Sequence, residues 1–160
     1  MIDDLNDHAR LVDGLSAAGG PNRASGTGRV IATHISSVLL TDGEAFKIKK
    51  PVDFGFLDFS TLEKRRQACE DEVRLNGRLA PDIYLGVVPV TGSLDHPDFG
   101  GDGEPLEYAV HMRQFAADAL LADHPDLLSA PRVDDIARQV ARFQESIARA
   151  PGDGEFGQPE

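Results

Sequence analysis

Two charged residues, Lys47 and Glu72, have the types and positions that could hold a phosphate group. Lys47 lies in the strand-like segment Glu44–Lys49, where side chains alternate between two faces, so that Ala45, Lys47 and Lys49 share one face. A lysine is a point charge on a long stem, which suits a phosphate oxygen. The small side chain of Ala45 leaves room beside Lys47 for a flat group.

Glu72 lies in a predicted helix over residues 60–80, where about 100° per residue places it in the middle of an apolar stripe. The other members of that stripe are Ala68, Cys69, Leu75 and Leu79. A carboxylate on a buried face is costly unless a cation reaches it. We therefore predict that Glu72 pairs with Lys47, and Lys49 is the second candidate because it lies on the same strand face.

A strand lysine paired with a glutamate on the next helix is the device by which protein kinases hold nucleotide phosphates. Spacing alone leaves a simpler alternative open. Lysines at strand edges are commonly solvated residues that prevent strand-to-strand aggregation. A glutamate in a helix stripe can also extend its carboxylate to the surface.

The remaining segments predict an α+β fold. In chain order they are a helix over residues 3–18, a loop over 17–28, strands Arg29–Ile35, Ser37–Thr41 and Glu44–Lys49, the helix over 60–80, strands Tyr84–Val90 and Glu107–Met112 separated by a loop over 91–105, and helices from Ala116. The turn Asp42-Gly43 indicates a hairpin. Ser60-Thr61-Leu62-Glu63 is a capping box that opens the second helix. Strands with one helix, followed by helices alone, favour two packed sub-domains.

Composition excludes several classes of function. The formal net charge of −11 repels nucleic acid, and the short basic run at Lys47, Lys49 and Lys50 is too small for a duplex footprint. No apolar run is long enough to span a membrane. The acidic start of the chain is unlike a secretory signal, so we expect a cytoplasmic protein. A single cysteine, Cys69, forbids an internal disulfide.

Other reactive side chains offer weaker signals. The histidines show no ligand spacing, and we predict no metal site. They are His8, His34, His96, His111 and His124. We expect His111 and Cys69 to be core residues. We also expect the runs Lys64-Arg65-Arg66 and Glu70-Asp71 to be solvated.

Three segments resemble a bacterial family described as aminoglycoside phosphotransferase-like or gluconate-kinase-like. They are FKIKKPVDFGFLDFSTLEKR, LAPDIYLGVVPV and YAVHMRQF, and the resemblance covers roughly residues 29–150. It implies a protein-kinase-like N-terminal lobe, an antiparallel sheet of about five strands with one helix, followed by the first helices of a C-terminal lobe. The domains expected are 1–28 (helix and loop), 29–115 (the lobe), 116–150 (incomplete helical lobe) and 151–160 (disordered tail).

The resemblance also implies a nucleotide site for ATP with Mg²⁺. Lys47 is expected to hold the phosphates and Glu72 to hold Lys47. The glycine-free turn that carries Thr33, His34, Ser36 and Ser37 is expected to cover the phosphates, and Met112 and Arg113 to lie against the adenine.

No catalytic residue is assigned. A kinase of this fold needs a catalytic aspartate in a His-Gly-Asp-like loop, which we expect beyond residue 160, and His96-Pro97-Asp98 and His124-Pro125-Asp126 are interpreted as turns. The chain is expected to bind ATP weakly and to be inactive alone. The alternative is a non-catalytic module that contacts a second lobe, or another copy of itself, through the apolar stripe Val133–Ile147. The phosphate acceptor is not identified.

Overall fold

The structure, a computed structural model, describes residues 2, 4–19, 28–116 and 118–149. The chain divides into two compact units at Phe115, and each is described by itself. The N-terminal unit is an α+β layer structure, as predicted. The expected segment 151–160 and most of the loop 17–28 lie outside the described residues.

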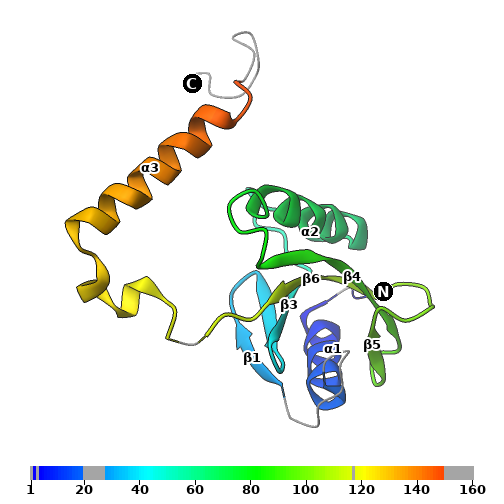
Figure 1. Cartoon of the computed structure of the whole chain (residues 1–160). Helices are drawn as coiled ribbons and strands as arrows, with labels where there is room; N and C mark the ends of the chain where they lie inside the picture. The colour runs from blue at the N-terminus through cyan, green and yellow to red at the C-terminus, as the bar shows by residue number, and fades with distance from the viewer. Residues whose placement is uncertain (1, 3, 20–27, 117, 150–160) are drawn as a thin grey trace. The chain divides into compact units, whose positions relative to one another are not determined.

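The N-terminal unit is built on a curled antiparallel sheet (Figure 1). Its strands are β1 (Arg29–Ala32), β2 (Ser36–Leu40), β3 (Glu44–Lys49), β4 (Tyr84–Gly92), β5 (Pro97–Phe99) and β6 (Glu107–Arg113). Their spatial order is β1-β2-β3-β6-β4-β5. Strand β6 therefore lies between β3 and β4, although it is the last strand in the sequence. It joins the strands β1-β2-β3 to the hairpin β4-β5.

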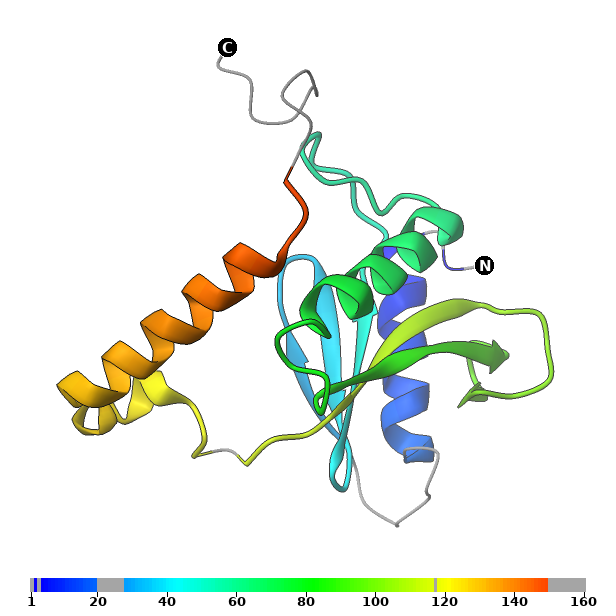
Figure 2. The same ribbon diagram turned by 45° about the horizontal axis from the view of Figure 1, so that its top comes forward.

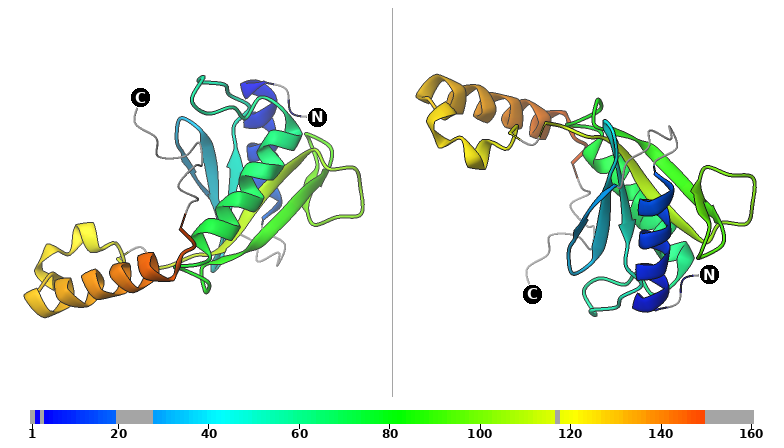
Figure 3. Two further views of the ribbon diagram at one scale, coloured as in Figure 1. Left: turned by 90° about the horizontal axis from the view of Figure 1, so that it is seen from above. Right: turned by 90° about the horizontal axis from the view of Figure 1, so that it is seen from below.

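Helices α1 (Leu5–Ala18) and α2 (Leu62–Asn76) cover opposite faces of the sheet (Figure 3). Side chains of α1 pack on the face that carries Phe46 and Ile48, and this layer is the apolar core. Its buried members are Ile2, Leu11, Val12, Leu15, Leu39, Phe46, Ile48, Val90, Phe99 and Ala109. The alternate residues of β3 face α2 instead. Sheet alternation thus separates the core from the face that carries Lys47.

Local sequence accounts for most element boundaries. Asp4 caps α1 by accepting hydrogen bonds from the backbone N–H groups of Asn6 and Asp7. Gly43 in the predicted hairpin turn has φ of 83°, a conformation that glycine adopts without strain. The predicted capping residue of α2 was wrong by one position, because Thr61 and not Ser60 accepts from the Lys64 N–H.

Three further predictions about elements need correction. A turn held by Thr33 ends β1 at Ala32 and starts β2 at Ser36, so the predicted first strand was too long. The loop predicted over 91–105 contains the short strand β5, which pairs with β4. Helix α2 ends at Asn76, and Leu75 and Leu79 of the predicted apolar stripe are 39% and 64% exposed.

Strand β3 and helix α2 are joined by a long loop over residues 50–61, which extends beyond the sheet (Figure 2). Phe59 of this loop is buried, whereas Phe56 is 85% exposed. The ring of Phe54 lies 6.1 Å from that of Phe56 and 6.3 Å from the imidazole of His34. The loop therefore places aromatic rings beside the turn between β1 and β2.

The second unit contains two short 3-10 turns, Leu121–Asp123 and Pro125–Leu127, and helix α3 (Ala130–Ser146). Helix formation was thus predicted correctly for α3 but not for the stretch directly after Ala116. Of the apolar residues of the predicted stripe, Val133, Ile136, Val140 and Ile147 are 41–48% exposed, and Phe143 is half-buried. None of the helices in the described ranges has the length and apolar character needed to cross a bilayer.

Candidate functional site

The carboxylate of Glu72 holds two lysines of β3 at once. Its Oε1 accepts a hydrogen bond from the Nζ of Lys47 at 2.8 Å, and its Oε2 accepts one from the Nζ of Lys49 at 2.7 Å. The predicted contact between Lys47 and Glu72 is therefore confirmed. The second candidate, Lys49, is a partner as well and not a substitute for the first.

Strand alternation and helix placement together create this cluster. Lys47 and Lys49 are two positions apart on β3, so both point to the face that α2 covers. Helix α2 lies over β6 and β4, and β6 is the neighbour of β3 in the sheet. This position of the helix brings Glu72 within reach of both ammonium groups. The three charged side chains of the cluster come from one strand and one helix.

The three charged side chains differ in their exposure. The side chain of Lys47 is 27% exposed, whereas those of Glu72 and Lys49 are 12% and 6% exposed. The Nζ of Lys49 also lies 5.1 Å from the centroid of the buried Phe59 ring, a cation–π contact. Burial alone raises the pKa of Glu72, but the hydrogen bonds from Lys47 and Lys49 outweigh it and leave the pKa below its ordinary value. Glu72 is thus ionised at neutral pH.

The sheet face around Lys47 is apolar. Val38 of β2 and Val110 of β6 are the cross-strand neighbours of Lys47, and Met112 is the neighbour of Ala45. The side chain of Ala45 contributes only a methyl group to this face. The structure therefore places Lys47 among apolar residues, of which Ala45 and Val110 are buried, and it brings the predicted residue Met112 to the same face.

The turn between β1 and β2 is held by its own hydrogen bonds. The Oγ1 of Thr33 accepts from the backbone N–H of Ser36 at 3.0 Å and from that of Ile35 at 3.3 Å. The N–H of Thr33 donates to the carbonyl of Ser36 at 2.8 Å. These backbone donors are engaged within the turn, whereas a glycine-rich phosphate loop directs its donors at the ligand. Of the predicted residues of this turn, Thr33 and His34 are exposed, whereas Ser36 and Ser37 are buried.

Two predicted site residues have other partners. Ser37 lies on the opposite face of the sheet from Lys47, since its Oγ lies 3.0 Å from the Nε2 of His8 in α1 and both side chains are buried. Including Ser37 in the site was wrong because adjacent strand residues face opposite ways. The Nε of Arg113 donates to the carbonyl of Asp82 and its N–H to that of Ile83. Arg113 thus ties β6 to the loop before β4.

The sequence prediction missed a second ion pair on α2. The Nε of Arg65 donates to the Oε2 of Glu107 at 2.6 Å, and both side chains are completely buried. The same guanidinium donates to the carbonyls of Phe59 and Ile2 at 2.9 Å each. Arg65 was predicted to be solvated together with its neighbours. Its position about two helical turns before Glu72, hence on the same helix face, was the available signal.

The remaining candidate residues act as packing or surface groups. Cys69 is buried, and burial raises the pKa of its thiol to about 12, so it is a poor nucleophile at neutral pH. The imidazole of His111 stacks on Phe46 at 4.7 Å and contacts Glu44 at 2.9 Å. Among the residues that the structure describes, no three histidine, cysteine or acidic side chains form a group that could bind a metal ion.

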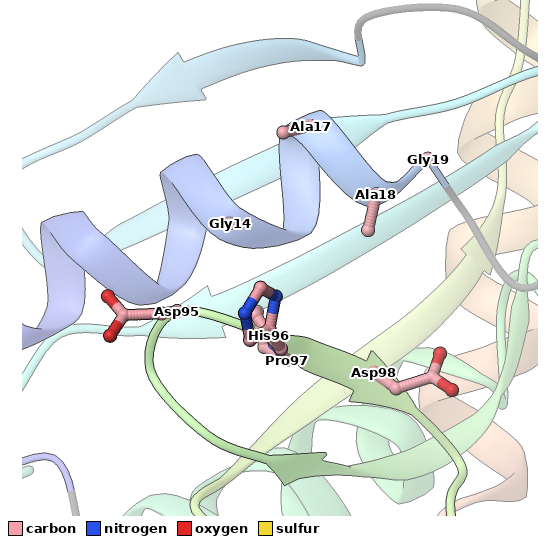
Figure 4. Close-up of a pocket in the computed structure, with 8 residues that line it drawn as sticks. All are labelled: Gly14, Ala17, Ala18, Gly19, Asp95, His96, Pro97 and Asp98. Carbon is pink, nitrogen blue, oxygen red and sulfur yellow. The ribbon is translucent and has the colours of Figure 1, made fainter.

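A separate open pocket lies at the C-terminal end of α1 (Figure 4). It is lined by Gly14, Ala17, Ala18 and Gly19 of that end and by Asp95, His96, Pro97 and Asp98 at the start of β5. Pro97 is buried, whereas Asp95, His96 and Asp98 are exposed. The run His96-Pro97-Asp98 thus belongs to a hairpin on the α1 side of the sheet, away from Lys47.

The comparisons with known proteins give relatives but no activity. The chain is 40% identical over 119 residues to an uncharacterized protein of Mycobacterium bovis and to uncharacterized proteins of two Mycobacterium tuberculosis strains. The match covers 73% of this chain and 22% of each relative, so the chain spans about a fifth of their length. No family model and no solved structure matches.

Proposed function

We propose that this chain is the nucleotide-binding lobe of an ATP-dependent small-molecule phosphotransferase of the protein-kinase-like fold. The observation that carries the proposal is the contact of 2.8 Å between Lys47 on the third strand and Glu72 on the following helix. Protein kinases place their phosphate-holding lysine and its glutamate partner on the corresponding strand and helix. The resemblance to aminoglycoside phosphotransferase-like proteins points to the same class.

The surroundings of Lys47 support a nucleotide as the ligand. Ala45 and Met112 are cross-strand neighbours, and in this proposal the base lies against the half-buried Met112. Lys47 projects from the same face, and its ammonium group has three donors, of which one binds Glu72. In this proposal the remaining donors of this partly exposed ammonium group bind phosphate oxygens. In this proposal Thr33 and Ser36 shape the turn, and His34 lies nearest the phosphates.

The metal is proposed to arrive with the nucleotide. Glu72 is the carboxylate of the Lys47 cluster, and both of its oxygens already accept from lysines. Mg²⁺ commonly binds through substrate phosphates with few protein ligands. We therefore assign no Mg²⁺ ligand to the described part of the chain. The cytoplasm, where ATP is abundant, is the compartment that the proposal requires.

Binding, and not phosphoryl transfer, is the activity proposed for these residues. The 160-residue sequence contains no His-Gly-Asp-like loop that could supply a catalytic base. The proposal does not identify the alcohol that accepts the phosphate, because it assigns the residues of the cluster to nucleotide binding only.

A calorimetric titration of the whole chain with ATP and Mg²⁺ tests the proposal. We expect binding to the wild type, and at least a tenfold loss in Lys47→Ala because the phosphate contact is removed. Lys64→Ala is the matched control, since Lys64 is an exposed lysine of α2 whose Nζ bonds Asp58. Lack of ATP binding by the wild type refutes the proposal. An equal loss of ATP affinity in both variants would show that only the net charge of the chain matters, and not the position of Lys47.

The exposed stripe of α3 supports a second candidate, a module that self-associates. Val133, Ile136 and Val140 recur at helical spacing, and each is at least 41% exposed. A second copy could bury this stripe by pairing helix against helix. Light scattering on the wild type and on Val140→Asp tests this: a dimer that the substitution dissociates supports it, and a monomeric wild type refutes it.

A further inference from the structure

The two lysines that bind Glu72 differ in their exposure to solvent and in their contacts. Lys49 is 6% exposed and lies against the Phe59 ring, whereas Lys47 is 27% exposed. Both ammonium groups lie within 2.8 Å of the same carboxylate. Lys49 is thus enclosed on its ring side and its carboxylate side, while Lys47 keeps access to solvent.

The balance of charge in the cluster differs from that of a simple ion pair. One lysine with one glutamate is electrically neutral, so much of its attraction for a phosphate is cancelled at a distance. Two ammonium groups with one carboxylate carry one net positive charge. Close charges in a partly buried site interact more strongly than in water. The second lysine therefore makes the electrostatic potential at the cluster more positive and strengthens its attraction for an approaching anion.

We propose that Lys49 is a positioning residue that neutralises Glu72, so that Lys47 presents an uncompensated positive charge to the ligand's phosphates. This inference rests on the proposed nucleotide function. Lys49 itself does not contact the ligand in this arrangement. It keeps the Glu72 carboxylate fixed and balanced while Lys47 binds both that carboxylate and a phosphate oxygen.

The proposal separates two ligands that share a base but differ in charge. In Lys49→Met the long unbranched side chain still packs on Phe59, but the Lys47–Glu72 pair becomes neutral. We expect ATP with Mg²⁺ to bind roughly tenfold more weakly, because one close charge is lost from the site. Adenosine has no phosphate, so its affinity is expected to stay within about twofold of the wild type.

A double variant distinguishes charge balance from simple packing. Lys49→Met combined with Glu72→Gln removes one positive and one negative charge, and the net charge of the cluster returns to that of the wild type. We expect most of the lost ATP affinity to return. Loss of packing alone predicts instead that the double variant is worse than Lys49→Met. Lys64→Met, which removes an exposed charge of the same sign, is the control.

Titrations followed by calorimetry and by NMR shifts of the whole chain decide the matter. If the wild type binds neither ATP nor adenosine, the nucleotide function falls and the role of Lys49 falls with it. If the wild type binds ATP and Lys49→Met binds it equally well, only the role of Lys49 is overturned. Equal losses of ATP and adenosine overturn it too. If Lys49→Met does not fold, or adenosine is too weak to measure, the double variant decides: wild-type ATP affinity supports the proposal and a tenfold loss overturns it.

Discussion

Replacing Arg65 by methionine is expected to destabilise the N-terminal unit strongly. Arg65 and Glu107 are both completely buried and joined at 2.6 Å. Removing one partner leaves the Glu107 carboxylate buried without a counter-charge, which typically costs about 3–5 kcal/mol. The carbonyls of Phe59 and Ile2 also lose their donors. We therefore expect the free energy of unfolding at pH 8 to fall by about 4 kcal/mol, a large part of the roughly 5–15 kcal/mol that stabilises a small domain.

The loss should depend on pH in a defined direction. Burial raises the pKa of Glu107 to about 7, while Arg65 opposes the rise. Because this pKa is raised above the unfolded value, its contribution to stability is complete below pH 4.5 and is lost as pH rises through 7. Without Arg65 the pKa rises further. The variant's deficit should thus be larger at pH 8 than at pH 5 by roughly 1 kcal/mol, because the wild-type carboxyl already ionises near pH 7 and only about one pH unit separates that value from pH 8.

Urea unfolding followed by circular dichroism measures both effects. Arg66→Met is the matched control, since Arg66 is the next residue and forms an exposed pair with Glu70. Its effect is expected to be small at both pH values. Adding Glu107→Gln to Arg65→Met should restore part of the stability at pH 8 and remove the pH dependence. A deficit below about 1 kcal/mol, or one that does not change with pH, would falsify the assignment of a buried ion pair.

Three further changes probe other parts of the unit. Glu72→Gln leaves the buried Lys49 without a carboxylate and should lower the free energy of unfolding by about 2–3 kcal/mol, against little change for the exposed Glu70→Gln, as measured by urea unfolding. Burial lowers the pKa of His8 to about 4, with Lys50 and Arg65 adding to the effect, so its contribution is present above pH 6.5 and is lost as pH falls towards 4. The difference in stability between wild type and His8→Asn should shift by about 3 kcal/mol over that range, and a flat difference curve contradicts the burial argument. Gly43→Ala should lower the melting temperature through a cost of about 1 kcal/mol, because φ is 83° there although the added methyl group meets nothing, whereas Gly103→Ala should not.

The contact at the centre of the site could be predicted because it follows from periodicity. Alternation along β3 puts Lys47 and Lys49 on one face, and helical spacing puts Glu72 on the inner side of α2. These rules need no knowledge of the remaining fold. The order of the sheet is different in kind, because the insertion of β6 between β3 and β4 depends on contacts distant in sequence. The local pattern of residues 107–112 does not reveal that this strand pairs with β3.

The wrong predictions for Ser37 and Arg65 also arose because contacts distant in sequence determine where these side chains lie. Ser37 was placed with Ser36 in the turn between the first two strands, yet both belong to β2, where adjacent residues face opposite ways, and Ser37 contacts His8. Arg65 was grouped with Lys64 and Arg66 by charge. Its burial depends on a carboxylate at position 107, which local sequence does not reveal. Charge runs describe the average solvation of a segment, and they fail for the one member that finds a distant partner.

The ionic contacts of Arg65 and Glu72 with strands of the sheet hold α2 in position over it. Arg65 and Glu72 lie about two turns apart on one helix face, and their partners are on β6 and β3. The first pair anchors the beginning of the helix, and the second anchors its later part. Because a helix held at two points cannot rotate or slide without breaking one of them, the Arg65 pair fixes the place of the Glu72 carboxylate. The proposed binding of ATP should therefore weaken when Arg65 is replaced, although Arg65 lies outside the cluster, and calorimetric titration of Arg65→Met with ATP and Mg²⁺ measures this.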